Sequence, residues 1–408
     1  MRYYRYSEDW ISNLEGDVRA RMIETLRGLS LKRLQKYPPP KISGLPVGNE
    51  TRILSRFARG KSSQLDPSVF SGLLRSFLSA DEKRLYRAFR QNKFLSVYEW
   101  AAIIGSENVD DWIAHKFLRT DQDGDLQCQF SIVSLDGLIF AAEPLKDHGV
   151  HWEAEFVTDN NSRDFNDIRP FYHAYIGLDT LQMIEVMEKI PLPKGGRYLD
   201  CGPGSGGLLL YFARRFDEAI GIDINPRASV LSQFNADLNG LENCKTYNDD
   251  ALELAGKYGK FDLVSWNLPF IFMPEKDKDN FIDAFGGEMG IGLCLSFLKT
   301  LPEIMTETGV ACIAAMAPIL ENGENFLESK LLEILGSLSL DCETQVAQIS
   351  LAHSRELWQF HKSFGLRTFE NVYLFLERGH GKLSRIEAPI SRRIVDLLRE
   401  RMYARKFA

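Results

Sequence analysis

The pattern of hydrophobic and polar positions changes near residue 171. Beyond it, short apolar runs alternate with helical segments such as "PRASVLSQFNADLNG". This alternation favours an α/β fold with an open, mostly parallel sheet and helices on both of its faces. The expected strands are "RYLDCG", "EAIGIDI", "CKTYND", "FDLVSWN" and "GVACIAAMA", with "LRTFENVYLFLERG" returning as an antiparallel strand.

The preceding part of the chain has a different pattern. Three amphipathic helices are expected after residue 80, and a segment that alternates like strands follows them, with Asp-Gly turns at Asp123-Gly124 and Asp136-Gly137. Three helices and a hairpin resemble a winged helix, a fold that binds DNA in many proteins and protein or small ligands in others. The third helix offers a poor surface for a DNA groove, because it sets three acids against two bases: Glu107, Asp110 and Asp111 against Lys116 and Arg119.

These patterns divide the chain into four parts. We predict a mainly helical, winged-helix-like domain over residues 1–150, a linker or covering segment over 151–170, an α/β domain over 171–380 and a basic helix over 381–408. Between Asp17 and Arg75 the basic residues outnumber the acids about three to one. Such a stretch is typical of a solvated helical face or of an anion-binding surface.

The composition narrows the possible classes of protein. The 408 residues carry a net charge of -7, which weighs against a protein whose main task is to grip phosphate backbones. Six scattered cysteines without a CxxC pair indicate reduced thiols in a cytoplasmic protein, and we expect no metal site. No run approaches 18 apolar residues, so neither a secretion signal nor a membrane span is expected.

The segment "LDCGPGSGG" follows the first strand of the α/β domain. Its glycines permit a tight turn and a close approach of the backbone to a ligand, and the next helix points its N–H groups at the same space. These features suit a nucleotide-like ligand. Gly202, Gly204 and Gly207 also fit the dinucleotide pattern GxGxxG, and a glycine-rich turn without a ligand is a further alternative.

Polar residues also end the next three strands. Asp223 ends the second strand, where a carboxylate can accept both ribose hydroxyls, and Asp250 follows the third, where an acid can accept the adenine amino group. Either acid could instead cap the next helix. The fourth strand ends in "NLPF". Because open α/β sheets bind ligands at the carboxyl edge of their strands, we expect one site there.

With these motifs, residues 171–378 resemble the class I S-adenosylmethionine-dependent methyltransferases, which have a Rossmann-like, seven-stranded, mostly parallel sheet. The chain is most similar to the branch with an Asn-Pro-Pro-aromatic motif, which methylates planar nitrogens. That branch includes glutamine N5-methyltransferases acting on release factors, and methyltransferases of adenine and of ribosomal RNA guanine. "GIDINPRASVLSQFNADLNGL" is similar to this branch. The resemblance implies S-adenosylmethionine as the cofactor.

The resemblance also assigns roles to residues. Asp200 and the glycines after it would line the methionine and ribose side, Asp223 would hold the ribose, and Asp250 the adenine. The cofactor-binding residues that it implies are Asp200, Gly202, Gly204, Gly206, Asp223, Ile224, Asp250, Ala251, Asn267, Tyr172 and Tyr175.

The "NLPF" segment supplies the candidate catalytic residues. The Asn267 side-chain oxygen and the Leu268 carbonyl could accept the hydrogens of a planar nitrogen, Pro269 would stiffen the turn, and Phe270 could stack on the substrate. A simple Asn turn beside a core phenylalanine is the alternative. Leu268 stands where the family has proline, so a conformational restraint is lost, and a guanidinium, an amine or another small-molecule nitrogen could fit.

The segment 271–292, "IFMPEKDKDNFIDAFGGEMGIG", is rich in phenylalanine and contains consecutive glycines. We expect either a loop over the acceptor pocket, with Gly286 and Gly287 as hinges, or an ordinary surface excursion.

The sequence therefore favours an S-adenosylmethionine-dependent N-methyltransferase acting on a protein side chain or a small molecule. One alternative is a nucleic-acid methyltransferase that modifies an RNA or DNA base and holds phosphates with its basic helices. An NAD-dependent oxidoreductase is another, although no His, Lys or Tyr is placed to handle a hydride. A catalytically silent binding module is the last, and the oligomeric state stays open.

Overall fold

The computed structural model describes seven stretches of the chain: residues 10–29, 31, 79–90, 92–143, 176–278, 284–350 and 355–387. The predicted linker over 151–170, together with Tyr172 and Tyr175, lies outside the described residues.

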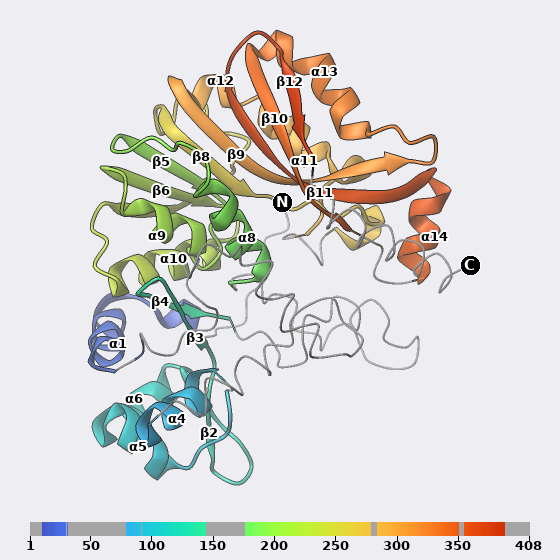
Figure 1. Ribbon diagram of the computed structural model, residues 1–408. Coiled ribbons are helices and arrows are strands. Elements are labelled where there is room, and N and C mark those ends of the chain that lie inside the picture. The colour runs from blue at the N-terminus through green and yellow to red at the C-terminus, as the bar shows by residue number, and fades with distance from the viewer. Residues whose placement is uncertain are drawn as a thin grey trace.

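An eight-stranded sheet forms the centre of the larger part of the molecule (Figure 1). Its order is β7-β6-β5-β8-β9-β11-β10-β12, and within it only β11 runs antiparallel to its neighbours, β9 and β10. The strands are β5 (Arg197–Cys201), β6 (Glu218–Asp223), β7 (Cys244–Asn248), β8 (Phe261–Asn267), β9 (Met305–Leu320), β10 (Leu340–Ser350), β11 (Leu366–Arg378) and β12 (Leu383–Ile386).

The predicted fold class is confirmed, with one addition. The seven strands β5–β11 form the mostly parallel sheet of the class I methyltransferase fold. The eighth strand, β12, pairs parallel to β10 inside the segment 381–408, for which we expected a basic helix. Residues 388–408 lie outside the described part of the chain, so the rest of that helix stays a prediction.

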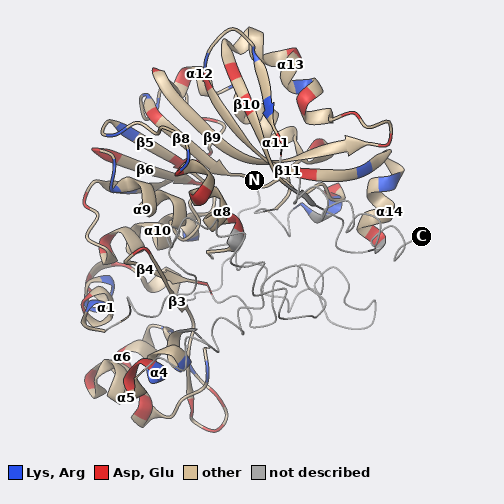
Figure 2. Ribbon diagram, viewed as in Figure 1, with Lys and Arg blue, Asp and Glu red and all other residues tan. Residues whose placement is uncertain are grey.

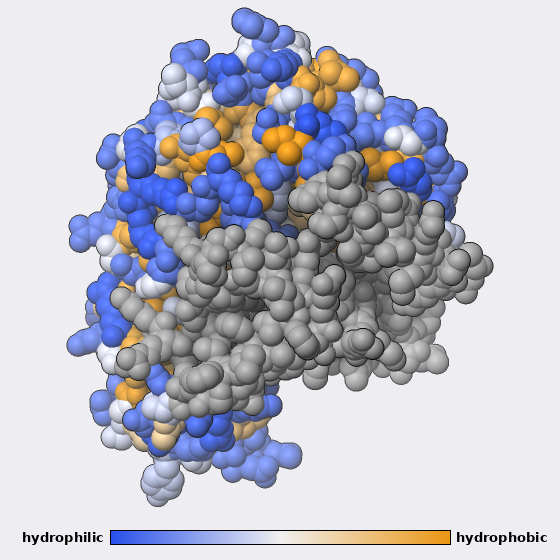
Figure 3. Space-filling model, in the orientation of Figure 1, coloured by the Kyte–Doolittle hydropathy of each residue, from blue (hydrophilic) through white to orange (hydrophobic). Residues whose placement is uncertain are grey.

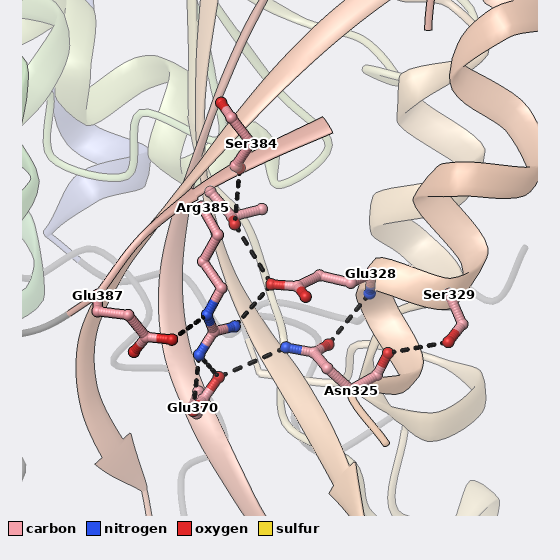
Figure 4. Close-up of polar contacts among 8 residues, drawn as sticks. Asn325, Glu328, Ser329, Glu370, Ser384, Arg385 and Glu387 are labelled. Atoms are coloured by element: carbon pink, nitrogen blue, oxygen red, sulfur yellow. Dashed lines mark hydrogen bonds and ion pairs between the residues drawn. The ribbon is translucent and has the colours of Figure 1, made fainter. Parts of the chain in front are cut away.

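Arg385 attaches β12 to two other elements (Figure 4). Its guanidinium donates to Glu328 at 2.6 Å, to Glu370 at 2.9 Å and to Glu387 at 2.7 Å. Burial raises the pKa of Glu370, and the charge of Arg385 opposes this rise. The strand is therefore held to the helix α13 and to β11 by one shared cation.

Helices cover both faces of the sheet, as the strand–helix alternation predicts. Consecutive strand residues point to opposite faces, so Tyr198 packs with α8 and α9, whereas Leu199 packs with α11 and α13. The helices of this part are α8 (Leu178–Met187), α9 (Gly207–Ala213), α10 (Pro226–Leu238), α11 (Gly292–Leu298), α12 (Leu301–Ile304), α13 (Phe326–Leu338) and α14 (Arg355–Ser363), with short 3-10 turns η4 (Glu275–Asp277) and η5 (Glu288–Gly290).

The N-terminal part contains the predicted helices and both Asp-Gly turns. Ser79 and Ser96 each open a helix with a complete capping box, which satisfies otherwise unpaired N–H groups. The elements are η1 (Ile11–Asn13), α1 (Gly16–Gly28), α4 (Ala80–Leu85), the π-helical η3 (Tyr86–Arg90), α5 (Val97–Ile104), α6 (Ser106–Ala114), β1 (Leu118–Thr120), β2 (Leu126–Cys128), β3 (Ser131–Leu135) and β4 (Leu138–Ala142). The strands form two separate hairpins, β1–β2 and β3–β4. The winged-helix assignment itself stays a prediction.

Helix α10 joins the two parts of the molecule. Leu231, Phe234 and Leu238 on one side of α10 are buried in the same hydrophobic cluster as the N-terminal helices. The β3–β4 hairpin lies between these helices and the sheet domain, and it packs against α8 and α9 (Figure 1). Consequently the expected N-terminal domain shares its core with a helix of the sheet domain.

The surface carries both signs of charge, interspersed over the described elements (Figure 2). Helix α6 has three acids and no base along its length, in keeping with its poor suitability for a DNA groove. The described part of the face in Figure 3 is mainly hydrophilic, with small scattered apolar patches. Within the described stretches, no helix is both long and apolar enough to cross a bilayer.

Candidate functional site

The glycine turn after β5 lies at the carboxyl edge of the sheet, beside the end of β8. Gly202, Gly204 and Gly206 all have positive φ (61°, 57° and 90°), a conformation that residues with a Cβ atom avoid. Gly202 is exposed, and a Cβ there would approach the Trp266 indole nitrogen to 3.0 Å. The backbone of Gly202 is therefore exposed at this edge, and Gly204 beside it is half-buried.

Gly206 has a different role in the turn. It is buried, and a Cβ there would lie 2.7 Å from the Leu210 side chain and 3.4 Å from that of Ser232. The glycine thus lets the turn pack against α10. Gly207 allows an equally close approach of α8, since its Cβ would lie 2.8 Å from the Thr180 side chain.

Asp223, at the end of β6, holds the glycine turn in place. One of its carboxylate oxygens accepts a hydrogen bond from the Gly204 N–H at 3.1 Å, and the other accepts from Asn225 N–H at 2.9 Å. An ionised carboxylate only accepts hydrogen bonds, which is the role that a ribose hydroxyl would require of it. The side chain is at the predicted place, the carboxyl edge of the second strand.

Asp200 faces the interior. Its side chain is buried, and Oδ1 accepts a 2.6 Å hydrogen bond from Ser265 of β8, whose hydroxyl also pairs with Tyr198. Burial raises the pKa of Asp200 to about 7, and the charge of Asp223 adds to the rise. Asp200 thus supports the turn from inside the protein, and its side chain does not line the open edge. This position differs from our expectation that Asp200 lines the cofactor.

Two neighbouring acids follow β7, and their surroundings distinguish them. Asp249 is ion-paired with Lys257 at 3.0 Å and accepts from the Tyr258 hydroxyl at 3.1 Å. The Asp250 carboxylate accepts only from the backbone N–H of Leu252 among the described residues. Of the two, Asp250 is the acid with one carboxylate oxygen that accepts no hydrogen bond from the described residues, and its role in adenine binding stays a prediction.

Apolar surface accompanies these acids. Ile224, directly after Asp223, is 41% exposed, and Tyr247 near the end of β7 is 38% exposed. Apolar side chains beside a few polar groups are the usual lining of a small-molecule site, so this pair could face a planar ring. Ala251, by contrast, is buried in the core, so its side chain offers a ligand little contact surface.

Asn267 ends β8 with its amide held in one orientation. The amide nitrogen Nδ2 donates to the carboxylate of Asp179, in the first turn of α8, at 2.6 Å. The side-chain oxygen of Asn267 and the backbone oxygen of Leu268 accept no hydrogen bond from the described residues. Both oxygens that we expected to receive a substrate N–H group are therefore unused within the described part of the chain.

The rest of the motif packs into the protein. The Leu268 side chain is 2% exposed and belongs to the main core cluster. Pro269 is half-buried, and Phe270 lies between the main core and a smaller cluster around Phe272. Leucine at the first proline position thus contributes apolar contacts that the smaller proline ring would not make.

The segment after the motif is packed against its surroundings. Ile271 and Gly286 are joined by a backbone hydrogen bond, and the Phe272 carbonyl lies 2.8 Å from the ring nitrogen of buried His361 in α14. A Cβ at Gly286 would lie 2.8 Å from the Phe270 backbone, so this glycine is required for close approach. The need for glycine at position 286 thus comes from close packing, whereas we expected a hinge. Residues 279–283 of this segment lie outside the described part.

Asp179 and Asn235 are the polar residues that sequence reasoning missed. Asp179 stands in the first turn of a helix, where an acid is commonly explained by the helix dipole. Asn235 lies inside α10 and bonds Ser205 of the glycine turn. Asp179 belongs to no motif, and Asn235 lies in the segment that resembles the methyltransferase branch without having been singled out there. Only the three-dimensional arrangement brings the two residues to the site.

Comparison with known proteins agrees with the fold. Residues 192–361 match the family described as "Methyltransferase domain". This range contains β5 to β10 and the helices between them. Together with the strand order, the match shows that the chain carries a methyltransferase domain of the class I fold.

Curated relatives match shorter segments. A putative protein N5-glutamine methyltransferase of Methanocaldococcus jannaschii is 33% identical over 119 residues, covering 28% of this chain and 59% of the relative. Human EEF1A lysine methyltransferase 2 is 29% identical over 128 residues, covering 29% of this chain and 53% of the relative. The chain thus spans little more than half the length of these curated relatives.

Among solved structures, a ribosomal protein L11 methylase from Lactobacillus delbrueckii subsp. bulgaricus is similar with a TM-score of 0.33 and 18% sequence identity. The similarity covers 51% of this chain and 82% of that chain.

Proposed function

We propose that this protein is an S-adenosylmethionine-dependent N-methyltransferase that acts on a nitrogen of a protein side chain or a small molecule. One observation carries the proposal: two acceptor oxygens, on Asn267 and Leu268, receive no hydrogen bond from the described residues and lie at the carboxyl end of β8, beside the glycine turn of β5. Acceptors placed there can hold the hydrogens of an incoming nitrogen.

The residues at the edge suit the proposed cofactor. Asp223 would accept a ribose hydroxyl, Asp250 would accept the adenine amino group, and exposed Ile224 would cover one face of the adenine. The exposed backbone of Gly202 leaves room for the methionine portion. When bound, S-adenosylmethionine supplies a methyl group that is already activated by a sulfonium, so the protein mainly aligns a nucleophile with it.

The acceptor oxygens explain why nitrogen is the proposed nucleophile. The lone pair of an amide or guanidine nitrogen is delocalised, and positive charge develops on the nitrogen as its bond to the methyl carbon forms. Asn267 Oδ1 and the Leu268 carbonyl would favour that charge through hydrogen bonds to the N–H groups. Phe270, which is half-buried, would face a planar substrate.

A protein acceptor is supported by the names of the relatives, which denote methyltransferases of protein glutamine and of a lysine in EEF1A. We place the reaction in the cytoplasm, since all six cysteines are free thiols and none forms a disulfide.

The test uses the full-length protein and methyl-labelled S-adenosylmethionine with fractionated cell extract. Wild type should label an acceptor fraction, and Asn267→Ala should lower the rate about 100-fold, since one preorganised acceptor is worth about 2.7–4 kcal/mol. Asp223→Ala should instead weaken binding of S-adenosylhomocysteine, measured by calorimetry. Unchanged labelling by Asn267→Ala would refute the proposed site.

A thermal-shift comparison separates this proposal from an NAD-dependent enzyme. A ligand at 100 times its Kd stabilises the native state by about 2.7 kcal/mol. S-adenosylhomocysteine should therefore raise the Tm and NAD should not, and the reverse result would favour the oxidoreductase.

A further inference from the structure

We infer that Asp179 is a positioning residue, which fixes the amide of Asn267 so that its oxygen faces the methyl acceptor. This inference rests on the proposed function and extends it to a residue outside the motif. The two side chains come from α8 and β8, 88 positions apart in sequence, and they meet at 2.6 Å.

The chemistry of the contact determines the orientation of the amide. An ionised carboxylate can only accept hydrogen bonds, so the Asn267 atom that faces Asp179 must be the donor, Nδ2. The amide is planar, and Oδ1 therefore points away from Asp179. With Asp179 absent, the same amide could turn over and present its NH₂ group, which would oppose the N–H of an acceptor.

Asp179 is suited to this task because it has no other polar partner among the described residues. No Lys, Arg or His in that part of the chain forms an ion pair with it, and its only hydrogen bond is the one to Asn267. Within the described residues, the amide of Asn267 is therefore the group toward which this acid is directed. The negative charge polarises the amide and makes Oδ1 a stronger acceptor.

The position of Asp179 is fixed relative to the glycine turn. The neighbouring residue Thr180 and the preceding Ile176 pack over Gly207, where a Cβ would lie 2.8 Å from the Thr180 side chain. Helix α8 therefore approaches α9 closely, directly after the turn that faces the proposed cofactor. In this way Asp179 sets Asn267 relative to the methyl donor as well as to β8.

The size of the expected effect follows from two contributions. Free exchange between two amide orientations would lower kcat by a factor of two. Freedom of the side chain among several rotamers, together with the loss of polarisation, would lower kcat further. We expect Asp179→Ala to lower kcat about tenfold. Asp179→Asn keeps an acceptor oxygen for Asn267 and should lose only about two- to threefold.

A charge-exchange experiment gives a sharper result. Asn267→Asp alone places two carboxylates against each other, and its activity should fall at least about 30-fold. Asp179→Asn combined with Asn267→Asp restores a donor facing an acceptor, and the second oxygen of the carboxylate introduced on β8 stays free for substrate. The double variant should recover activity to within about fivefold of wild type, a rescue that a purely structural role would not produce.

The measurements are kcat and KM with labelled S-adenosylmethionine and the acceptor fraction found with wild type, and the affinity for S-adenosylhomocysteine by calorimetry. Glu185→Ala is the matched control, because Glu185 lies on the same helix and pairs with Lys189, away from the amide. It should behave as wild type.

The inference is overturned if Asp179→Ala keeps wild-type kcat, or if the double variant is no more active than Asn267→Asp. It is also overturned if the affinity for S-adenosylhomocysteine falls in parallel with kcat in every Asp179 variant. The carboxylate would then act on binding of the methyl donor. Absence of any methyl transfer by wild type would instead reject the proposed function. Crystal structures would then decide the inference, because an Asn267 rotamer unchanged in Asp179→Ala would refute it.

Discussion

Asp200 is enclosed between β5, β8 and α9, with Ser265 as its side-chain hydrogen-bond donor. Burial raises its pKa from 3.8 to about 7. The native state therefore holds a proton on this acid between about pH 4 and 7, where the unfolded chain has lost it. Because the native state binds more protons in this window, the free energy of unfolding falls as the pH rises through it, and it levels off above pH 7.

Asp200→Asn should remove this part of the pH dependence, because a neutral amide can still accept the Ser265 hydrogen bond. We expect the stability of the variant relative to wild type to increase between pH 4 and 7.5. Urea unfolding at several pH values measures this difference. Parallel pH profiles for the two proteins would contradict the raised pKa.

Leu268 shows what the sequence could and could not tell at the scale of one residue. The motif indicated where two acceptor oxygens would lie, and the structure has both at the end of β8. The leucine itself suggested a loosened turn, whereas its buried side chain contributes to the core. Side-chain burial depends on distant neighbours such as α11, and local spacing carries no information about them.

At the scale of elements, α10 binds β4 with two asparagine side chains. The amide of Asn235 pairs with both backbone groups of Ala141 and also donates to the Ser205 carbonyl in the glycine turn, each at 2.8 Å. Asn239, one helical turn later, pairs with both backbone groups of Ile139. Only Asn235 therefore links the N-terminal hairpin to the proposed cofactor turn.

Asn235→Ala and Asn239→Ala form a matched pair. Each should destabilise the protein, since an unsatisfied buried backbone group costs about 1–3 kcal/mol. Only Asn235→Ala should also weaken S-adenosylhomocysteine binding, by about threefold to tenfold, because it releases Ser205. Calorimetric titration and thermal melts of both variants provide the measurements. Equal affinities in the two variants would show that the turn does not depend on this link.

Across the whole molecule, the sequence predicted the elements better than their association. Periodicity of two and of 3.6 residues located the strands and helices, because each reflects one buried face. The strand β12 is short and has a central arginine, so its pattern offered no apolar signal. Similarly, Leu231 and Phe234 fitted an ordinary amphipathic helix, and nothing local showed that they complete the N-terminal core.

This shared core predicts that the described parts unfold together. Phe234 is fully buried in the cluster that contains Trp100 and Trp112, although it belongs to the sheet domain. Phe234→Ala should cost about 3–5 kcal/mol and lower a single melting transition. The loss of bound S-adenosylhomocysteine and the change in tryptophan fluorescence should then occur at one temperature. Two resolved melting transitions, with S-adenosylhomocysteine still bound after the first, would contradict this prediction. They would show that the N-terminal helices unfold independently and that α10 keeps the donor site intact without the N-terminal helices.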